Sequence, residues 1–534
     1  MSTARPARWA PIGLMTLGML GAAAVSGTSG SPLSPVLPPG GRALAPFRWA
    51  AGTLGLLSAS NATRAAAAFA ATALIAAGFL MAARASWNGW LSMRLVIGFG
   101  IGVQLLALLM PLLMSHDVYH YSMYGRIVAV HHANPYVATP ERFPSDPLFR
   151  FVGSEWRDVP AFYGPLFLRI TALVAGEVRS PAALIWAFKS ISAAAVIAAI
   201  AVTASLARWL WPERATFAVV ALAWNPVVAF GVVGAGHGDS LIALAVVTGV
   251  ALLVQSRDAA SGRRQFVLEL AATASLTLAG LMKSPLVIPV VIAIVASAWA
   301  RPEGARLARL AAHMVVVLAC VAVSALPFIS GRDPTLGLLQ LSSWSNFYSG
   351  SAAVQILTGI IFTGTLGSGV SNALATAVRI GFILAFGAVF FVLLRRLARD
   401  AAKLSPRDLG AAVAWSLLLF LLAAPILWPW YLVWFLPLLW FLPRLARQMS
   451  LVLCAVFPMF VIIAEQRYDP AMYRSLTIVG VGVLAPILLF ALIRFMREVV
   501  STANSNRALW ADVDANRATS STSRAGSPVV APRS

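Results

Sequence analysis

The strongest constraint on this sequence is a succession of long apolar runs. A helix needs about 20 mostly apolar residues to cross the roughly 30 Å hydrocarbon core of a bilayer, and runs of that kind recur along most of the chain. Of the 534 residues, 59% are hydrophobic and only 11% are charged, against about 45–50% and about 25% in soluble domains. This composition excludes an ordinary soluble enzyme and a disordered chain. We predict an all-α, polytopic membrane helix bundle.

The positions of the runs predict about 13–14 transmembrane helices. The candidate spans are residues 10–28, 64–82, 95–114, 183–207, 215–233, 240–254, 266–282, 286–300, 310–328, 374–394, 409–425, 429–442, 450–464 and 474–493. The Gly/Thr-rich stretch 353–369 suits a re-entrant segment or a loop helix. The stretch 163–178 contains Arg169 and suits an amphipathic interfacial helix.

Residues 1–496 therefore form the predicted membrane domain. Residues 497–534 are rich in Ser, Ala, Arg and Pro and have no apolar periodicity, which predicts a disordered cytosolic tail.

The basic residues predict the orientation. The net charge is +21, yet the arginines form short clusters between apolar runs and no basic stripe interleaved with aromatic residues. This pattern is typical of membrane-protein loops and argues against nucleic acid as a partner. All the clusters fall on one side of the predicted layout, which the positive-inside rule makes cytoplasmic. We expect a multi-pass plasma-membrane protein with both termini inside, although a cleaved signal at the first span stays open.

One segment on the opposite, exoplasmic side collects polar residues. Residues 115–181 hold six of the 19 acidic residues and four of the six histidines. These are Asp117, Glu141, Asp146, Glu155, Asp158 and Glu177, with His116, His120, His131 and His132. Because loops of this length are usually functional or disordered, and this one is rich in aromatic residues, we predict an ordered catalytic loop.

Asp117 is the strongest candidate for chemistry. It follows directly on the apolar span 91–114, and a carboxylate at the mouth of a helix bundle is partly desolvated. Burial of that kind raises the pKa toward a value suited to proton abstraction. The alternative is that Asp117, or Ser115 beside it, only caps the next helix.

A zinc site is a further hypothesis for the same segment. His116 and His120 have the H-x-x-x-H spacing, which puts two imidazoles on one helical face, and Asp117 stands where zinc proteases carry Glu. A third ligand would have to come from His131, His132 or a distant carboxylate. This hypothesis predicts a membrane metalloprotease.

Two more exoplasmic positions are polar where apolar residues would cost less. His237 and Asp239 lie in a glycine-rich turn and offer a hydrogen-bonding pair, although the turn also suits a plain connection between helices. Lys283 lies at a proline-broken helix junction on the side that is poor in lysine. It suits an anionic headgroup or a phosphate, and the alternative is a snorkelling interfacial lysine.

Aromatic residues also cluster toward the exoplasmic side. They are Trp428, Trp430, Tyr431 and Trp434, with Trp344, Phe347 and Tyr348 in another loop. The ordinary interpretation is an interfacial aromatic belt. Stacking on a saccharide or gripping a lipid is the alternative.

Several spaced motifs together resemble one known family. They are Asp117-Val118-Tyr119-His120-Tyr121, Asn134-Pro135-Tyr136, Trp156-Arg157-Asp158-Val159-Pro160, Tyr163-Gly164-Pro165-Leu166-Phe167-Leu168 and Gly236-His237-Gly238-Asp239. They resemble the polyprenol-phosphate-mannose-dependent α-(1→6)-mannopyranosyltransferases, a group within the GT-C class of membrane glycosyltransferases. The likeness covers residues 10 to 495. The family usually has Asn where this chain has Gly238.

The resemblance implies a many-helix bundle with an exoplasmic cavity for a lipid donor and an acceptor, and a catalytic aspartate at Asp117. Its motifs add Tyr121, Tyr163, Trp156, Arg157 and Asp158 as candidate substrate-binding residues. The product would be a lipomannan-type cell-envelope glycan.

The chemistry of such a transfer needs one general base and a cation for the leaving lipid phosphate. Lys283, Arg126 and His237 are the candidate cations. The expected partners are a polyprenyl-phosphate sugar, a glycan or glycolipid acceptor and the bilayer, and we expect neither a cofactor nor a metal. A flippase or transporter for lipid-linked sugar is the rival from another class, with Lys189 as the main charge inside a predicted span.

Overall fold

A computed structural model describes residues 9–34, 45–178, 180–329 and 350–465, and these ranges contain helices and no strand. All of them belong to one compact unit, Met1–Arg474, and a second unit, Ser475–Ser534, lies outside them. The predicted span 474–493, the predicted tail and the aromatic residues Trp344, Phe347 and Tyr348 also lie outside the described residues. The predicted fold class, an all-α polytopic bundle, is confirmed.

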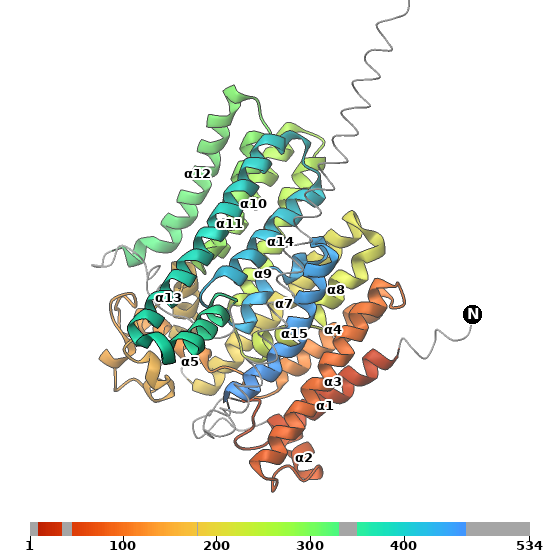
Figure 1. Ribbon diagram of the computed structural model, residues 1–534, viewed down its shortest axis with the longest axis vertical. Helices are drawn as coiled ribbons and strands as arrows, with labels where there is room; N and C mark the ends of the chain where they lie inside the picture. Colours follow the sequence, from red (N-terminus) through yellow and green to blue (C-terminus); the bar gives the residue numbers. More distant parts are fainter. Residues whose placement is uncertain (1–8, 35–44, 179, 330–349, 466–534) are drawn as a thin grey trace, which may run out of the picture. The chain divides into compact units, whose positions relative to one another are not determined.

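The helices follow the apolar runs (Figure 1). The α-helices are α1 (Ala10–Ser26), α2 (Ala45–Thr53), α3 (Asn61–Trp87), α4 (Met93–Leu109), α5 (Asp117–Ala129), α6 (Pro165–Glu177), α7 (Pro181–Leu210), α8 (Ala215–Ala223), α9 (Asp239–Gln255), α10 (Gly262–Gly280), α11 (Val287–Trp299), α12 (Glu303–Ala325), α13 (Gly350–Asp400), α14 (Pro406–Ala423) and α15 (Arg444–Glu465).

Short polar residues mark where several of these helices begin. The side chains of Ser60, Ser92 and Ser261 each accept a hydrogen bond from a backbone N–H in the first turn of α3, α4 and α10. Ser405 and Asp408 form a reciprocal capping box at the start of α14. Such caps satisfy N–H groups that have no partner within the helix.

Two stretches differ from their prediction. Residues 429–442, predicted as one span, form two short 3-10 helices, η11 (Pro429–Trp434) and η12 (Leu436–Phe441). Pro437 has no backbone N–H to continue an α-helix through this stretch, so the helix is interrupted there. Residues 353–369, predicted as a re-entrant segment or a loop helix, lie within the long helix α13.

Six helices of the described chain are long and apolar enough to cross a membrane. A seventh span results if the 3-10 turn η5 (Pro212–Arg214) and α8 form one bent span with η6 (Val227–Gly234). The six spans are Asn61–Trp87, Pro181–Leu210, Asp239–Asp258, Glu303–Phe328, Gly369–Lys403 and Pro406–Ala423. Three further apolar helices, Ala10–Ser26, Met93–Leu109 and Ser284–Trp299, have 10 to 17 residues. The larger predicted number of spans stays a prediction.

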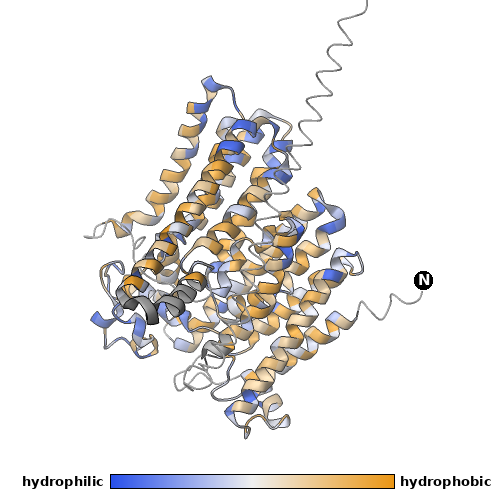
Figure 2. Ribbon diagram, viewed as in Figure 1, coloured by the Kyte–Doolittle hydropathy of each residue, from blue (hydrophilic) through white to orange (hydrophobic). Residues whose placement is uncertain are grey.

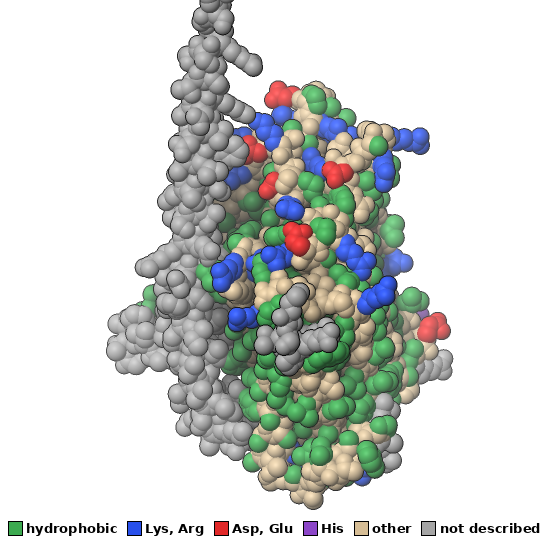
Figure 3. Space-filling model, turned by 90° about the vertical axis from the view of Figure 1, so that its right-hand side faces the viewer, with side chains coloured by type: hydrophobic (Ala, Val, Ile, Leu, Met, Phe, Trp, Pro, Cys, Tyr) green, Lys and Arg blue, Asp and Glu red, His purple; other side chains and the backbone are tan. Residues whose placement is uncertain are grey.

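The helices separate apolar from charged surface. Their middle turns are hydrophobic, and hydrophilic residues gather at the helix ends, most visibly at the upper end of α12 (Figure 2). A side view shows Lys and Arg side chains over the upper half of that face and mostly hydrophobic side chains below (Figure 3). α5 and α6 pack against each other, and α9 packs against both α7 and α10.

The described part of the predicted loop, residues 115–178, is built of short helical elements. It consists of α5, three 3-10 turns at Pro140–Arg142, Phe149–Phe151 and Ser154–Trp156, and α6. The predicted helix at 163–178 corresponds to α6.

Candidate active site

A strained turn places Asp117 at the start of α5. α4 ends at Leu109, and the chain then turns through Met114, whose φ of 60° lies in the left-handed region that non-glycine residues rarely adopt. The backbone N–H of Met114 donates to the carbonyl of Leu33 at 2.8 Å. Contacts from a distant part of the chain therefore hold this conformation, as is usual for strain at functional sites.

Lys189 holds the same turn from the side of α7. Its side chain is 1% exposed, and its ammonium donates to the carbonyl oxygens of Met110 and, at 3.3 Å, Pro111. These carbonyls follow the end of α4, where no helical partner remains. Lys189, the charge on which the transporter hypothesis relied, thus stabilises the turn after α4.

Asp117 itself is not a helix cap. The N-cap of α5 is His116, whose side chain makes no cap hydrogen bond. Ser115 Oγ accepts from the Asp117 backbone N–H at 3.1 Å, and the Asp117 side chain is 22% exposed. Burial raises the pKa of Asp117, whereas His116, the Ser115 hydroxyl and Lys283 act in the opposite direction. A carboxylate of this kind suits a general base.

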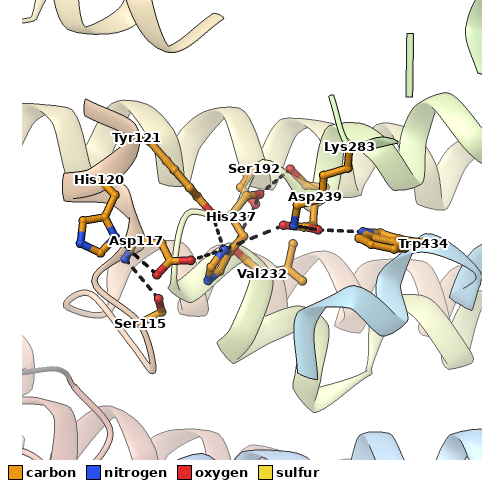
Figure 4. Close-up of polar contacts among 11 residues, drawn as sticks. Ser115, Asp117, His120, Tyr121, Ser192, Val232, His237, Asp239, Lys283 and Trp434 are labelled. Carbon is orange, nitrogen blue, oxygen red and sulfur yellow. Dashed lines mark hydrogen bonds and ion pairs between the residues drawn. The ribbon is translucent and has the colours of Figure 1, made fainter. Parts of the chain in front are cut away.

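The glycine-rich turn brings His237 to Asp117. The turn follows η6, which is a π-helix, and Gly236 has a φ of +69° that glycine adopts without strain. Ser192 Oγ, from α7, donates to the carbonyls of Val232 (3.1 Å) and His237 (3.3 Å). His237 Nδ1 then lies 3.8 Å from Asp117 Oδ2 (Figure 4).

His237 is a fully buried, neutral imidazole. Burial first, and the nearby Lys283 second, lower its pKa far below the ordinary value. Tyr121 Oη lies 2.7 Å from His237 Nδ1, and burial keeps the pKa of Tyr121 high. The neutral phenol and the imidazole therefore share one hydrogen bond at Nδ1, and the ring tautomer decides which of them is the donor. The other ring nitrogen, the buried Nε2, has no hydrogen-bond partner among the described residues.

Lys283 is joined to the turn through Asp239. Lys283 Nζ lies 2.8 Å from Asp239 Oδ1, and Trp434 Nε1 donates to the same oxygen at 2.7 Å. The other oxygen, Asp239 Oδ2, lies 3.9 Å from His237 Nδ1. Asp117, His237, Asp239 and Lys283 are thus linked by successive contacts of less than 4 Å (Figure 4).

The backbone of the Tyr163-Gly164-Pro165-Leu166 motif binds the residues just before Lys283. The N–H groups of Gly164 and Leu166 donate to the carbonyls of Met282 (2.9 Å) and Leu281 (3.0 Å). This places Tyr163 against Lys283. A small pocket results, lined by Tyr121, Tyr163, Phe167, Gly238, Asp239, Ile242, Met282 and Lys283.

Gly238, where the family usually has Asn, has no room for a side chain. A Cβ there would lie 2.2 Å from Cε2 of Phe167. The phenyl ring occupies the space that an asparagine side chain would need.

Four sequence-predicted residues lie elsewhere. Arg126 Nε pairs with buried Asp146 at 2.9 Å, and His131 Nε2 approaches the same carboxylate at 2.7 Å. Arg126 is therefore engaged in stabilising the loop and is not brought to Lys283. In the Trp156-Arg157-Asp158 run, Trp156 packs near His120, Arg157 donates to a loop carbonyl, and Asp158 is exposed.

The late aromatic residues do not form an exposed belt. Trp430 stacks on His237 with ring centroids 4.1 Å apart, and Lys283 Nζ lies 3.9 Å from the ring centre of Tyr431. Trp430 and Trp434 are 5% and 1% exposed. These two tryptophans pack directly against site residues, Trp430 against His237 and Trp434 against Asp239. No spacing in the sequence predicted that they would lie near Lys283.

The described part of the chain contains no group of three His, Cys, Asp or Glu side chains placed to share a metal ion. His120 Nε2 accepts from the Gly153 N–H at 3.3 Å, and His116 Nε2 lies 3.8 Å from Glu155. The third ligand that the metalloprotease hypothesis needs is therefore not found there.

Comparison with known proteins identifies a family. A family model described as alpha-(1->6)-mannopyranosyltransferase, N-terminal domain, matches residues 15–301, more than half of the chain. The chain belongs to this α-(1→6)-mannopyranosyltransferase family. It is thus a glycosyltransferase of a mannosyltransferase family, and its apolar helices identify a membrane protein. No curated protein and no solved structure matches it. The matched region includes Asp117, His237, Asp239 and Lys283.

Proposed function

We propose that this protein transfers mannose from a polyprenyl-phosphate donor to a glycan or glycolipid acceptor on the exoplasmic side, with Asp117 as the general base. The product would be an α-(1→6) linkage in a lipomannan-type cell-envelope glycan. The observation that carries the proposal is the linked set of Asp117, His237, Asp239 and Lys283. The set includes a partly exposed carboxylate, Asp117, and an ammonium, Lys283, that lines one small pocket together with Asp239.

The reaction divides between the two ends of this set. The acceptor hydroxyl loses its proton to the Asp117 carboxylate as its oxygen forms a bond to the anomeric carbon. The bond from that carbon to the phosphate oxygen breaks, and its electron pair leaves with the lipid phosphate. A single displacement of this kind inverts a β-linked donor to an α-linked product.

Lys283 has the right chemistry for the leaving phosphate. Its ammonium carries three N–H donors, and only one is needed for Asp239. Burial lowers the pKa of Lys283, whereas Asp239 and Asp117 raise it. Asp239, itself fixed by Trp434, thus keeps the ammonium charged and aimed at the pocket, where a buried charge stabilises an anion more strongly than in water.

The test is transfer by the purified full-length protein, with polyprenyl-phosphate mannose and an oligomannoside acceptor. Asp117→Asn keeps the shape of the side chain and removes the base, so the rate should fall by roughly 10²–10⁴-fold. Glu141→Gln is the matched control, because Glu141 is an exposed carboxylate of the same segment. Retention of more than a tenth of the rate by Asp117→Asn, with Glu141→Gln unchanged, would exclude Asp117 as the base.

A further inference from the structure

A second charged cluster lies away from the candidate active site. Its members are Arg257, Glu269, Arg301 and Arg309, here called the arginine cluster. α9 runs from Asp239 to Gln255, just before Arg257, and α10 runs back past Glu269 toward Lys283. At 1.5 Å per helical residue, Arg257 is about 27 Å from Asp239 along the bundle, and Glu269 about 21 Å from Lys283.

Glu269 is the centre of the cluster and has no exposed surface. Arg309 Nη1 lies 3.2 Å from its Oε2, and Arg301 Nη2 lies 3.6 Å from its Oε1. Gln265 Nε2 also donates to Oε1, at 2.9 Å. Arg257 enters from η7 (Ser256–Asp258) and donates to the carbonyl of Ala296 at 2.9 Å, near the end of α11.

The cluster has more positive than negative charge. Arginine stays protonated in proteins, so three guanidinium groups face one carboxylate, which leaves a net charge of +2. Three nitrogen atoms of the cluster are buried and have no hydrogen-bond partner in the described chain: Arg257 Nε, Arg301 Nε and Arg301 Nη2. Buried guanidinium N–H groups without an acceptor are costly, and a phosphate supplies acceptors in the geometry that arginine prefers.

A second buried donor site lies one helical turn further along. His313 follows Arg309 by four residues on α12 and has no exposed surface. Its Nδ1 pairs with the Thr273 hydroxyl at 2.8 Å, and its Nε2 has no partner among the described residues. Polar atoms without partners therefore extend from the arginine cluster along the α10–α12 contact.

The cluster can be reached from outside, and an apolar surface adjoins it. The side chains of Arg301 and Arg309 are 23% and 16% exposed. On α12, Leu307, Val315 and Leu318 are 77%, 66% and 60% exposed. The first turns of α12 are hydrophilic and the turns that follow are hydrophobic (Figure 2). A molecule with a phosphate head and acyl chains would contact both.

We propose that the arginine cluster is a binding site for a phosphate group, carried by an anionic lipid headgroup, at the end of the bundle opposite Asp117. The phosphate accepts from the guanidinium groups of Arg301 and Arg309, whose side chains are partly exposed, and offsets the net charge of +2. The acyl chains lie along the exposed face of α12. This site is separate from the proposed transfer reaction and does not depend on it.

The test is binding by the full-length protein in detergent, with three probes: dioctanoyl phosphatidylglycerol, dioctanoylglycerol and inorganic phosphate. Arg301→Gln should weaken binding of the phosphatidylglycerol roughly tenfold or more, since a hydrogen bond to a charged group is lost. Arg263→Gln is the matched control, because Arg263 is an exposed arginine in the first turn of α10 and lies outside the cluster, and it should bind as the wild type.

The probes separate the two sources of phosphate. Binding of the phosphatidylglycerol alone supports a lipid site, and equally strong competition by inorganic phosphate assigns the site to free phosphate instead. Dioctanoylglycerol lacks the phosphate and should not compete. If it binds as tightly as the phosphatidylglycerol, only apolar contacts are involved and the proposal is overturned.

A second variant guards against loss of folding. Glu269→Gln raises the net charge of the cluster from +2 to +3 and should tighten phosphatidylglycerol binding, the direction opposite to Arg301→Gln. A misfolded protein cannot produce that gain. Equal binding by both variants and the wild type would refute the site.

Discussion

The two ends of α9 and α10 carry opposite charge balances. At the Asp239 end, Asp117 and Asp239 face one ammonium, Lys283, whereas at the Glu269 end three arginines face one carboxylate. The first set has a partly exposed carboxylate, Asp117, which suits proton abstraction. The second has buried N–H groups without acceptors, which suits holding an anion. One pair of helices, α9 and α10, therefore connects the proposed transfer site with the proposed phosphate site.

After Asp117→Asn, the largest effect on transfer should come from Lys283. Lys283→Met removes the proposed stabilisation of the leaving phosphate, so the transfer rate should fall by roughly 10²–10³-fold. Asp239→Asn leaves the buried ammonium unpaired and should destabilise the fold by about 3–5 kcal/mol. The double variant should recover most of that stability without recovering the rate, as measured by thermal unfolding and by transfer. Recovery of both would reduce the pair to a structural role.

The next prediction concerns how the transfer rate and the stability depend on pH through Asp117. Because burial raises the pKa of Asp117, the transfer rate should fall about tenfold per pH unit below a midpoint that lies above the ordinary aspartate value. The raised pKa favours folding most below the unfolded pKa, and this contribution is lost as pH rises through the folded pKa. Asp117→Asn should thus raise the unfolding temperature relative to wild type at pH 7 and lose that advantage near pH 4. An unchanged difference across this range contradicts the assignment.

A smaller effect tests the packing of the pocket. Gly238→Asn introduces a Cβ 2.2 Å from the Phe167 ring and should cost about 1–3 kcal/mol of stability. Phe167→Ala in the same chain frees that space, and the double variant should be more stable than the sum of the single effects. Additive losses, measured by thermal unfolding, would show that the two positions do not compete for space.

The smallest effect is expected at the arginine cluster. Arg301→Gln should leave the transfer rate with saturating donor within about twofold of wild type, because the two sites share no partner. A larger loss in kcat, with normal unfolding, would show that the two ends are energetically coupled.

Hydropathy predicted most helices of this protein, because an apolar run long enough for a bilayer is a local property of the chain. It failed at residues 429–442, where prolines interrupt an apolar run and produce 3-10 helices. The site was only partly predictable. Asp117, His237 and Lys283 stood out as polar residues beside apolar runs, and the structure brings them together.

The remaining contacts depend on distant pairings. Lys189 finds its carbonyl partners 79 and 78 residues earlier, and Trp434 reaches Asp239 across 195 residues. Arg126 looked like a phosphate ligand because its partner Asp146 could not be recognised before the loop folded. Charge and composition identify which residues are unusual, but only the fold decides which of them are already satisfied.

The number of residues in the π-helix Val227–Gly234 sets where His237 and Asp239 lie. A π-turn accommodates an extra residue within a helix, so it behaves as an insertion absorbed without a loop. Deleting one residue there without a change in the π-helical winding would rotate the residues that follow by about a quarter of a turn. His237 and Asp239 would then leave Asp117 and Lys283, although no residue of the site had been substituted. Gain or loss of a single codon in this segment is thus a greater hazard to the site than most substitutions within it.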